Sequence, residues 1–510
     1  MVNIIQKIKH FLENYKNLIL FDFFLVAMSF GTRVFSANVT VDTDLFMTHP
    51  FSDYNWLDIG RWGLVLLKKI VNKSGFSIYY EGIMAFIVIV LFLLAYAFLF
   101  DYLSNKKYNY YIFSALFITH PIFAFQWFFK LQAFEIALSI LFIPISLYFI
   151  FEWLENKKII NIIIASILML ISFSCYQTNV ILYISSAIIC YILKYNDLKG
   201  FKENGIICLK LILSFLVVYL LNTMITKLFF ARSSYLSDTV LWDFSHIQNN
   251  IHLILSHVKE VLFGSYILNK VYFIGCSFLV VLFVIKIKQL NKQNIFNWIC
   301  LGCFVLTPFL LSLYMGSNPL YRSQYVLPFV IGCMYMLIYK EFSSIVDGKK
   351  LLIIQTIIVL ICGTFTMKQI KVTNKLWYSD DVRYQQDCQM LSSIIGDLHD
   401  QGIDYKHKPT VFIGTWRAPL NPQCFVPIET IGYSYFENGA QYEPYYFFSN
   451  DSIKKLALMQ GEKIAACDVG QCDQAREYSK NMPSYPKRGY IKEYDDLVVI
   501  KLSKDKIKEK

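Results

Sequence analysis

Charged side chains are scarce in this chain of 510 residues: Asp, Glu, Lys and Arg make up 17%, against 56% hydrophobic residues. So few charges cannot cover a water-facing surface, which excludes an ordinary soluble globular protein. Glycine and proline are sparse too, with 22 and 13 residues. No Gly-rich phosphate loop and no internal repeat stands out. This argues against a nucleotide-binding domain and, mildly, against a transporter built from inverted repeats.

The chain carries instead a series of about eleven apolar runs, each close to the length of about twenty residues that crosses a bilayer as a helix. We expect transmembrane helices at Leu18–Ala37, 82–100, 109–128, 132–152, 159–175, 177–194, 206–228, 270–287, 295–315, 322–340 and 350–367. A basic lead-in, 1–17, precedes this membrane domain, 18–367, and a polar tail, 368–510, follows it. The sequence thus predicts a polytopic α-helical membrane protein with a small soluble C-terminal domain.

Basic residues in the short loops orient the chain. Lysines gather at Lys106-Lys107, Lys157-Lys158, Lys194–Lys210, Lys286–Lys292 and Lys340–Lys350. If successive runs alternate in direction, these loops share one side, which the positive-inside rule makes cytoplasmic. The N-terminus is then cytoplasmic, while the loop 38–81 and the tail are extracytoplasmic. The net charge of +11 lies in the membrane part, so we attribute it to topology and anionic lipid rather than nucleic acid.

The tail combines a polar helix-like stretch with two β-rich runs, 409–416 and 496–503, which favours a small α/β domain. Most of the 12 cysteines lie in apolar runs, where they act as small apolar residues. Cys467 and Cys472 flank a loop-like DVGQ segment in the tail. They form either a disulfide or a pair of free thiols. A zinc site is not expected there, because no histidine lies at ligand spacing.

Acidic residues cluster in the loop after the first apolar run. Asp42, Asp44, Asp53 and Asp58 lie there together with His49. One residue separates Asp42 from Asp44, so in an extended segment both side chains would point to one face. Two close carboxylates can divide their roles, one ionised as a base and the other orienting a hydroxyl or holding a cation. The alternative is a solvated acidic loop without a chemical role.

The second half of this loop, Trp56 to Val71, predicts an amphipathic helix in the membrane interface. Its expected apolar face comprises Trp56, Ile59, Gly63, Leu66, Leu67 and Ile70, with Lys68 and Lys69 opposite. Arg61 has two interpretations. It pairs with Asp58 on one helix face, or it binds phosphate, because its planar fork suits phosphate oxygens.

Other polar candidates lie where apolar runs end. Lys130, near Glu135, places a charge close to the hydrocarbon region, which marks either a functional group or a snorkelling lysine. Arg322 either binds phosphate or caps the carbonyls of the preceding helix. Gln177 and Asn179 lie between two runs with hardly a loop. They either line a pocket or form hydrogen bonds between helices.

The acidic pair after the first run, followed by Gly60-Arg61-Trp62, resembles the Gtr-type glucosyltransferases. These are polytopic enzymes of GT-C architecture that modify O-antigen and related surface polysaccharides. The segments SCYQTN at 174–179 and NPLYRSQYVLP at 318–328 fit as well, as does MPSYPKRGYI near the C-terminus. The resemblance rests on the order of these motifs and on the topology, and it covers essentially the whole chain.

The resemblance implies transfer of a hexose, usually glucose, from a polyprenyl-phosphate sugar to a glycan hydroxyl on the outer face of the bacterial inner membrane. Asp42 and Asp44 take the place of the family's general base. The expected substrate-binding residues are Arg61, Trp62, Lys130, Gln177, Arg322, His49 and Asp58. A single displacement inverts the anomeric configuration and uses cations near the leaving phosphate.

No cofactor is expected, because a monophosphate donor does not need the metal that a DxD pair binds in nucleotide-sugar enzymes. The implied partners are the lipid-linked donor, the polysaccharide acceptor and the bilayer. A lipid-sugar flippase and a cytoplasmic polyprenyl-phosphate glucosyltransferase would supply the donor.

Two other functions stay open. A polysaccharide polymerase would move whole repeat units, but that family typically places its large external loop between late spans. A non-enzymatic flippase or transporter of lipid-linked sugars would need charged residues along a path inside the spans. Apart from Asp22 and Glu135, the apolar runs carry few.

Overall fold

The computed structural model describes most of the chain. The described residues are 2–39, 42–48, 54–71, 75–104, 107–195, 201–230, 239–242, 247–287, 292–343, 345–346, 348–438 and 446–504. Their contacts divide the chain into two compact units. The bundle unit comprises Met1–Ser36 and Ser52–Asn374, and the tail unit comprises Ala37–Phe51 and Lys375–Lys510. His49 and Asp53, two residues of the predicted acidic cluster, lie outside the described residues.

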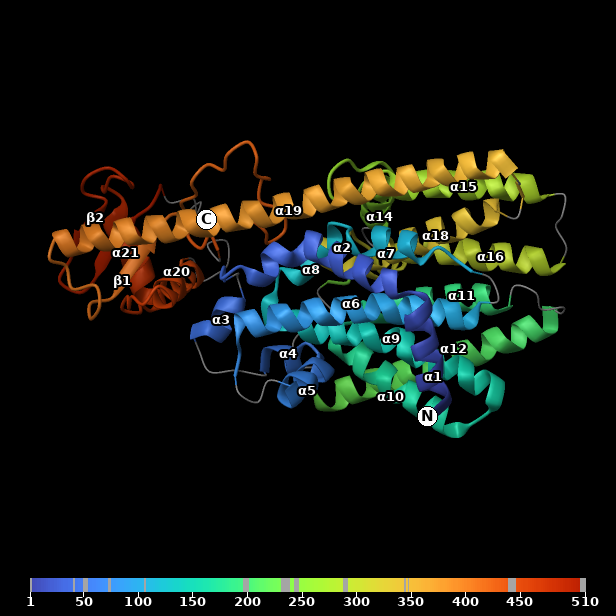
Figure 1. The fold of residues 1–510 in the computed structure, drawn as a ribbon. Helices are drawn as coiled ribbons and strands as arrows, with labels where there is room; N and C mark the ends of the chain where they lie inside the picture. The colour runs from blue at the N-terminus through green and yellow to red at the C-terminus, as the bar shows by residue number, and fades with distance from the viewer. Residues whose placement is uncertain are drawn as a thin grey trace. The chain divides into compact units, whose positions relative to one another are not determined.

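Helices build the bundle unit (Figure 1). They are α1 (Val2–Asn14), α2 (Lys16–Phe35), α4 (Tyr54–Asp58), α5 (Trp62–Val71), α6 (Ile78–Leu103), α7 (Tyr110–Ile118), α8 (Ile122–Trp127), α9 (Lys130–Asn156), α10 (Ile159–Cys175), α11 (Asn179–Tyr195), α12 (Phe201–Phe229), α14 (Ile247–Phe263), α15 (Val271–Lys286), α16 (Lys292–Leu306), α17 (Leu310–Met315), α18 (Val326–Phe342) and the first part of α19 (Gly348–Asp400). Two single turns of 3-10 helix, η3 (Thr307–Phe309) and η4 (Tyr321–Ser323), join some of them.

Within the described residues, six helical stretches are long and apolar enough to cross a membrane: α2, α6, α9, α12, Ile295–Met315 and α19. The helices α10, α11 and α15 are apolar but shorter. On α12 the apolar side chains of Val217 and Leu220 are 64% and 62% exposed, as suits a lipid-facing helix and not a water-facing one. These helices support a polytopic membrane protein, and the number of about eleven crossings stays a prediction.

One expected helix is interrupted. The apolar run 109–128 was predicted as a single span, but it forms α7 and α8 with a break at Thr119–Pro121. Pro121 has no N–H to continue the hydrogen bonding of α7, and its fixed φ suits the start of a helix. Thr119 Oγ1 donates to the carbonyl of Ala115 at 2.7 Å, which satisfies one carbonyl at the end of α7. The prediction of one continuous helix is therefore wrong.

Aromatic side chains fill the middle of the bundle unit. The ring of Phe329 in α18 lies 5.0 Å from that of Tyr96 and 5.5 Å from that of Phe117, centroid to centroid. Close approach of α18 to α7 depends on Gly332, because a Cβ at that position would lie 2.8 Å from the carbonyl oxygen of Phe113. The rings of these two pairs are tilted or edge-on to each other, geometries that aromatic rings favour.

The tail unit contains a three-stranded sheet of order β1-β3-β2. Strand β1 (Thr410–Ile413) pairs in parallel with β3 (Val498–Lys501), and β2 (Ile491–Glu493) pairs with β3 in antiparallel. Strands β1 and β3 lie within the two β-rich runs identified in the sequence. The helices of this unit are α3 (Thr43–Thr48), the later part of α19, α20 (Phe447–Met459) and α21 (Val469–Ser479).

The later part of α19 is the main support of the tail unit. Its apolar face, including Ile394 and Leu398, packs in one core with Phe412 of β1 and Ile500 of β3. Its polar face binds a neighbouring loop, since Asp387 accepts hydrogen bonds of 2.7 Å from Ser434 Oγ and from the Tyr435 backbone N–H. This helix thereby fixes the segment around Tyr435 that the acidic loop also contacts.

Candidate functional site

The acidic turn, Asp42–Asp44, belongs to the tail unit. Asp42 has φ of 70°, a left-handed conformation that aspartate tolerates better than most residues. The chain then enters α3 at Thr43. As a result the Asp42 side chain is exposed, whereas Asp44 is only 3% exposed. The prediction that both carboxylates share one face of an extended segment is wrong, because the chain turns between them.

Asp44 faces the interior of the tail unit, where α3 packs on α20. Burial raises its pKa to about 6, the positive charge of Lys455 opposes this rise, and the negative charge of Asp42 adds to it. Lys455 itself forms an ion pair of 2.5 Å with Asp451 one turn earlier on α20. Asp44 Oδ1 accepts the Leu45 backbone N–H at 2.9 Å. A carboxyl group with a pKa near neutrality is suited to acid–base chemistry.

Two hydrogen bonds attach the segment before the acidic turn to the rest of the tail unit. The hydroxyl of Tyr435 donates to the carbonyl of Val39 at 3.2 Å. The side-chain amide of Asn38 donates to the carboxylate of Asp381 on α19. Because Tyr435 is itself held by Asp387, this support reaches from α19 to the acidic loop.

A group of cations surrounds the turn Phe128–Phe129 of the bundle unit. Arg33 donates through Nη2 to the carbonyl of Phe128 at 2.7 Å, and its guanidinium lies 5.4 Å from the Phe128 ring centroid. The guanidinium of Arg322 lies 5.2 Å from the centroid of Phe129. Lys130 follows directly and is buried, and its ammonium donates to the carbonyl of Ser36. Three elements, α2, α9 and η4, thus bring these cations around one aromatic turn.

The Gly60-Arg61-Trp62 turn depends on the absence of a side chain at position 60. Gly60 has φ of +76°, and a Cβ there would lie 2.5 Å from Thr226 Cγ2. Trp62 stacks on Phe230, with ring centroids 6.1 Å apart and planes at 21°. This close approach places Arg61 between α4 and α5, at the point where the predicted interfacial helix is interrupted.

Arg61 lies over the Tyr176 ring at 4.6 Å, and its Nε donates to Gln177 Oε1 at 3.4 Å. Gln177 in turn donates to the carbonyl of Ile59 at 3.2 Å. The ring of Tyr176 lies 6.1 Å from that of Tyr325. Gln177 therefore positions Arg61 at the end of the bundle that carries the short turn between α10 and α11.

Asn179 forms hydrogen bonds between helices. Its amide donates to Ser139 Oγ at 2.8 Å and to the carbonyl of Ser172 at 2.9 Å. Its carbonyl oxygen accepts from the hydroxyl of Tyr325 at 2.5 Å. Of the two interpretations left open by the sequence, the interhelical one describes Asn179.

A buried ion trio, Lys68, Glu81 and Glu135, connects α5 with α6 and α9. The Lys68 ammonium lies 3.3 Å from Glu81 Oε1 and 2.8 Å from Glu135 Oε1. The three side chains are 4%, 0% and 0% exposed. The expected place of Lys68 on the polar face of an interfacial helix is wrong, because the two carboxylates bind Lys68 inside the bundle while Leu66 and Ile70 are exposed.

The predicted site residues are divided between the two units. Asp42 and Asp44 belong to the tail unit. Arg61, Trp62, Lys130, Gln177, Arg322 and Asp58, the last residue of α4, belong to the bundle unit. Sequence reasoning missed Arg33, Lys455 and the contact of Tyr435 with the acidic loop. Arg33 had a visible signal, since a charge inside an apolar run marks a functional candidate, whereas Lys455 and Tyr435 are brought to the acidic loop only by folding.

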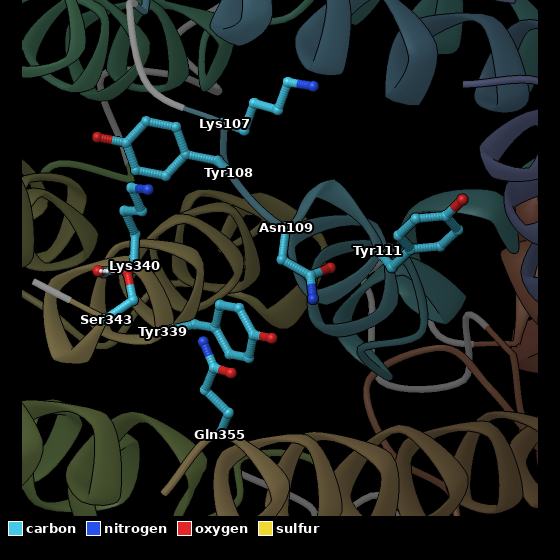
Figure 2. A pocket seen from close by; sticks show the side chains of 8 residues that line it. All are labelled: Lys107, Tyr108, Asn109, Tyr111, Tyr339, Lys340, Ser343 and Gln355. Carbon is cyan, nitrogen blue, oxygen red and sulfur yellow. Dashed lines mark hydrogen bonds between the residues drawn. The ribbon is translucent and has the colours of Figure 1, made fainter. Parts of the chain in front are cut away.

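Within the described residues, no group of three or more His, Cys, Asp or Glu side chains is arranged to hold a metal ion. A cavity of about 320 Å³ lies elsewhere in the bundle unit. Figure 2 shows its lining, which comprises Lys107, Tyr108, Asn109, Tyr111, Tyr339, Lys340, Ser343 and Gln355. Two lysines and no carboxylate line it, and none of the predicted site residues does.

Comparison with known proteins shows the family to which the chain belongs. The family model described as glucosyl transferase GtrII matches residues 13–339, which is more than half of the sequence. No curated protein and no solved structure matches the chain. The matched region includes the acidic turn, the Gly60-Arg61-Trp62 turn and the cations around Phe128–Phe129. The resemblance seen in the sequence is confirmed: the chain belongs to the GtrII glucosyl transferase family.

Proposed function

We propose that this glycosyltransferase moves a hexose, glucose in keeping with its family, from a polyprenyl-phosphate sugar to a hydroxyl group of a surface polysaccharide such as O-antigen. The reaction takes place on the extracytoplasmic face of the bacterial inner membrane. Membership of the GtrII glucosyl transferase family supports the reaction class, which is glycosyl transfer. The apolar helices support a lipid-linked donor, and the lysine-rich loops support an extracytoplasmic acidic turn.

The acidic turn supplies the base. Asp42 is exposed and can reach an acceptor hydroxyl, whereas Asp44 is enclosed by α20. A general base must first lie within reach of the proton that it removes, and its pKa is considered after that. We therefore assign proton removal to Asp42 and assign to Asp44 the positioning of the turn. The charge of Asp44 also acts on Asp42, since the two carboxylates interact electrostatically.

In the reaction, the acceptor O–H gives its proton to the Asp42 carboxylate while the acceptor oxygen attacks the anomeric carbon. The bond from that carbon to the phosphate oxygen breaks, and its electron pair leaves with polyprenyl phosphate. This single displacement inverts the anomeric configuration. In the bundle unit, Arg33, Lys130 and Arg322 offer positive charge for the leaving phosphate, and Arg61 is a further candidate.

The test uses the full chain in detergent with a radiolabelled polyprenyl-phosphate glucose and the host's surface glycan. Asp42→Asn should abolish transfer while donor binding persists. Asp44→Asn should retain part of the activity, and it should lack the fall in rate that we expect for the wild type below about pH 6. Asp473→Asn, an exposed carboxylate on α21, serves as the control and should transfer normally. The opposite pattern, activity in Asp42→Asn and none in Asp44→Asn, would make Asp44 the base.

The buried ion trio is the observation that favours a second function, a flippase of lipid-linked sugar, because such a protein needs charges inside its helical bundle. If the wild type transfers no hexose but moves labelled lipid-linked sugar across liposomes, the flippase replaces the transferase. Product size separates the remaining alternative, since a polymerase would add whole repeat units where a glucosyltransferase adds one sugar.

A further inference from the structure

Two cysteines meet at the start of α21 in the tail unit. Asp468 is the N-cap of this helix and forms a capping box with Gln471: the Gln471 backbone N–H donates to Asp468 Oδ1 at 2.7 Å, and the Asp468 N–H donates to Gln471 Oε1 at 2.9 Å. In a capped helix, the residue before the N-cap packs against the fourth helical residue. Here these positions are Cys467 and Cys472, and their sulfur atoms lie 3.7 Å apart. Local helix capping therefore holds the two thiols together.

A lysine from α20 completes the cluster. The ammonium of Lys454 lies 3.1 Å from Cys467 Sγ. Cys467 is partly exposed, whereas Cys472 is buried. Donation by the Cys472 thiol and the charge of Lys454 together lower the pKa of Cys467 to about 6, against the effect of burial. The N-terminus of α21 adds a favourable field for a negative charge. These contacts favour the thiolate form of Cys467 and place a second thiol beside it.

We propose that Cys467 and Cys472 form a reactive dithiol that is oxidised by thiol–disulfide exchange, with Cys467 as the attacking residue and Cys472 as the resolving one. The Cys467 thiolate attacks a sulfur of an organic disulfide, a mixed disulfide forms, and one thiolate leaves. Cys472 then loses its proton and attacks Cys467 Sγ. The Cys467–Cys472 disulfide forms, and the second thiolate of the oxidant leaves. The pair loses two electrons and the oxidant gains them.

The other cysteines of the described tail unit have different surroundings. Cys388 lies on α19, and the Cys424 thiol donates to Asn421 Oδ1 at 3.6 Å. The described residues place neither of them against a lysine or a second sulfur atom. Their presence gives the experiment internal controls, because a general reactivity of tail thiols would modify all of them.

The first experiment measures thiolate chemistry. The full chain in detergent is alkylated with iodoacetamide between about pH 5 and pH 9, and the rate at each cysteine is followed by mass spectrometry. We expect Cys467 to react near pH 6.5 about fivefold faster than free N-acetylcysteine, since most of its thiol is ionised there. Lys454→Gln should move the pH midpoint of Cys467 upward. An unchanged midpoint in Lys454→Gln, or a midpoint near 8.5 in the wild type, would overturn the proposal.

The second experiment tests the exchange with oxidised glutathione as the probe. The wild type should yield a Cys467–Cys472 disulfide without a lasting glutathione adduct. Cys472→Ser should accumulate glutathione on Cys467, and Cys467→Ser should accumulate none at Cys472. Cys424→Ser should behave as the wild type does. A glutathione adduct that persists on wild-type Cys467 would show that Cys472 does not resolve it. Gel filtration of each variant establishes that it is folded, and hexose transfer need not be measured.

Discussion

At the scale of single residues, the burial of Asp44 is the feature that differs most from what the sequence predicts. The sequence identified the acidic pair and its place after the first apolar run. It could not show that Asp44 is enclosed, because α20, the helix that packs on α3, lies far along the chain. Nor could it show that Asp42 takes a left-handed turn, since no glycine marks that position. The chemistry of the pair was predictable, and its division into one exposed and one buried carboxyl was not.

The raised pKa of Asp44 gives a pH-dependent stability. In the unfolded chain this carboxyl loses its proton near pH 3.9, whereas in the folded unit it keeps the proton up to about pH 6. Between these values the folded state binds more protons, so the free energy of unfolding falls as pH rises. The cost reaches about 3 kcal/mol above pH 6. Asp44→Asn should therefore raise the melting temperature at pH 7.5 and leave it unchanged at pH 4. An equal shift at both values would contradict this account.

Arg322 provides a prediction about donor binding. If its fork binds the leaving phosphate, Arg322→Gln should lower kcat/KM about 10- to 100-fold, the loss expected for one or two charge-assisted hydrogen bonds. Arg322→Lys should recover only part, because a single ammonium does not reproduce the planar fork. Steady-state kinetics against varied donor concentration checks both. Lys349→Gln, an exposed lysine at the start of α19, should show wild-type kinetics. Full activity of Arg322→Gln would remove this residue from the phosphate site.

At the scale of elements, hydropathy located the long helices well, because α2, α6 and α9 must each carry an apolar run to lie in a bilayer. Short elements were harder. The expected helix Trp56 to Val71 breaks at Gly60, and α5 turns a different face to the bundle than its periodicity suggested. The reason is that Lys68 lies between Glu81 and Glu135 inside the bundle, so that Leu66 and Ile70 are on the exposed side of α5.

The buried ion trio should therefore anchor α5. Lys68→Met leaves two carboxylates enclosed without their cation and should destabilise the bundle unit by about 3–5 kcal/mol. Lys69→Met, the exposed neighbour on the same helix, should have little effect. The triple variant Lys68→Met, Glu81→Gln, Glu135→Gln removes all charges and should recover much of the stability. Thermal unfolding in detergent measures all three. A Lys68→Met protein as stable as Lys69→Met would mean that the trio contributes nothing.

At the scale of the whole molecule, the acidic loop and the tail fold as one compact unit although they lie far apart in sequence. A protein that ends at Asn374 would lose Tyr435, Asp381 and Lys455, which hold or face residues 38–44. We expect the amides of α3 to exchange with deuterium much faster in this truncated protein than in the full chain. Equal protection in both would show that the loop folds without the tail.

The family match ends at residue 339. The acidic turn lies inside the matched region, yet it belongs to one compact unit with residues beyond position 339. This has a consequence for recombination between relatives. A chimera that exchanges only the tail would combine the acidic loop of one parent with the tail of another parent. The transferable module is discontinuous: residues 37–51 and 375–510 must come from the same parent. Chimeras that are built to transfer specificity between members of the family should have their junctions at these boundaries. Random crossovers that survive selection should keep the two segments from the same parent.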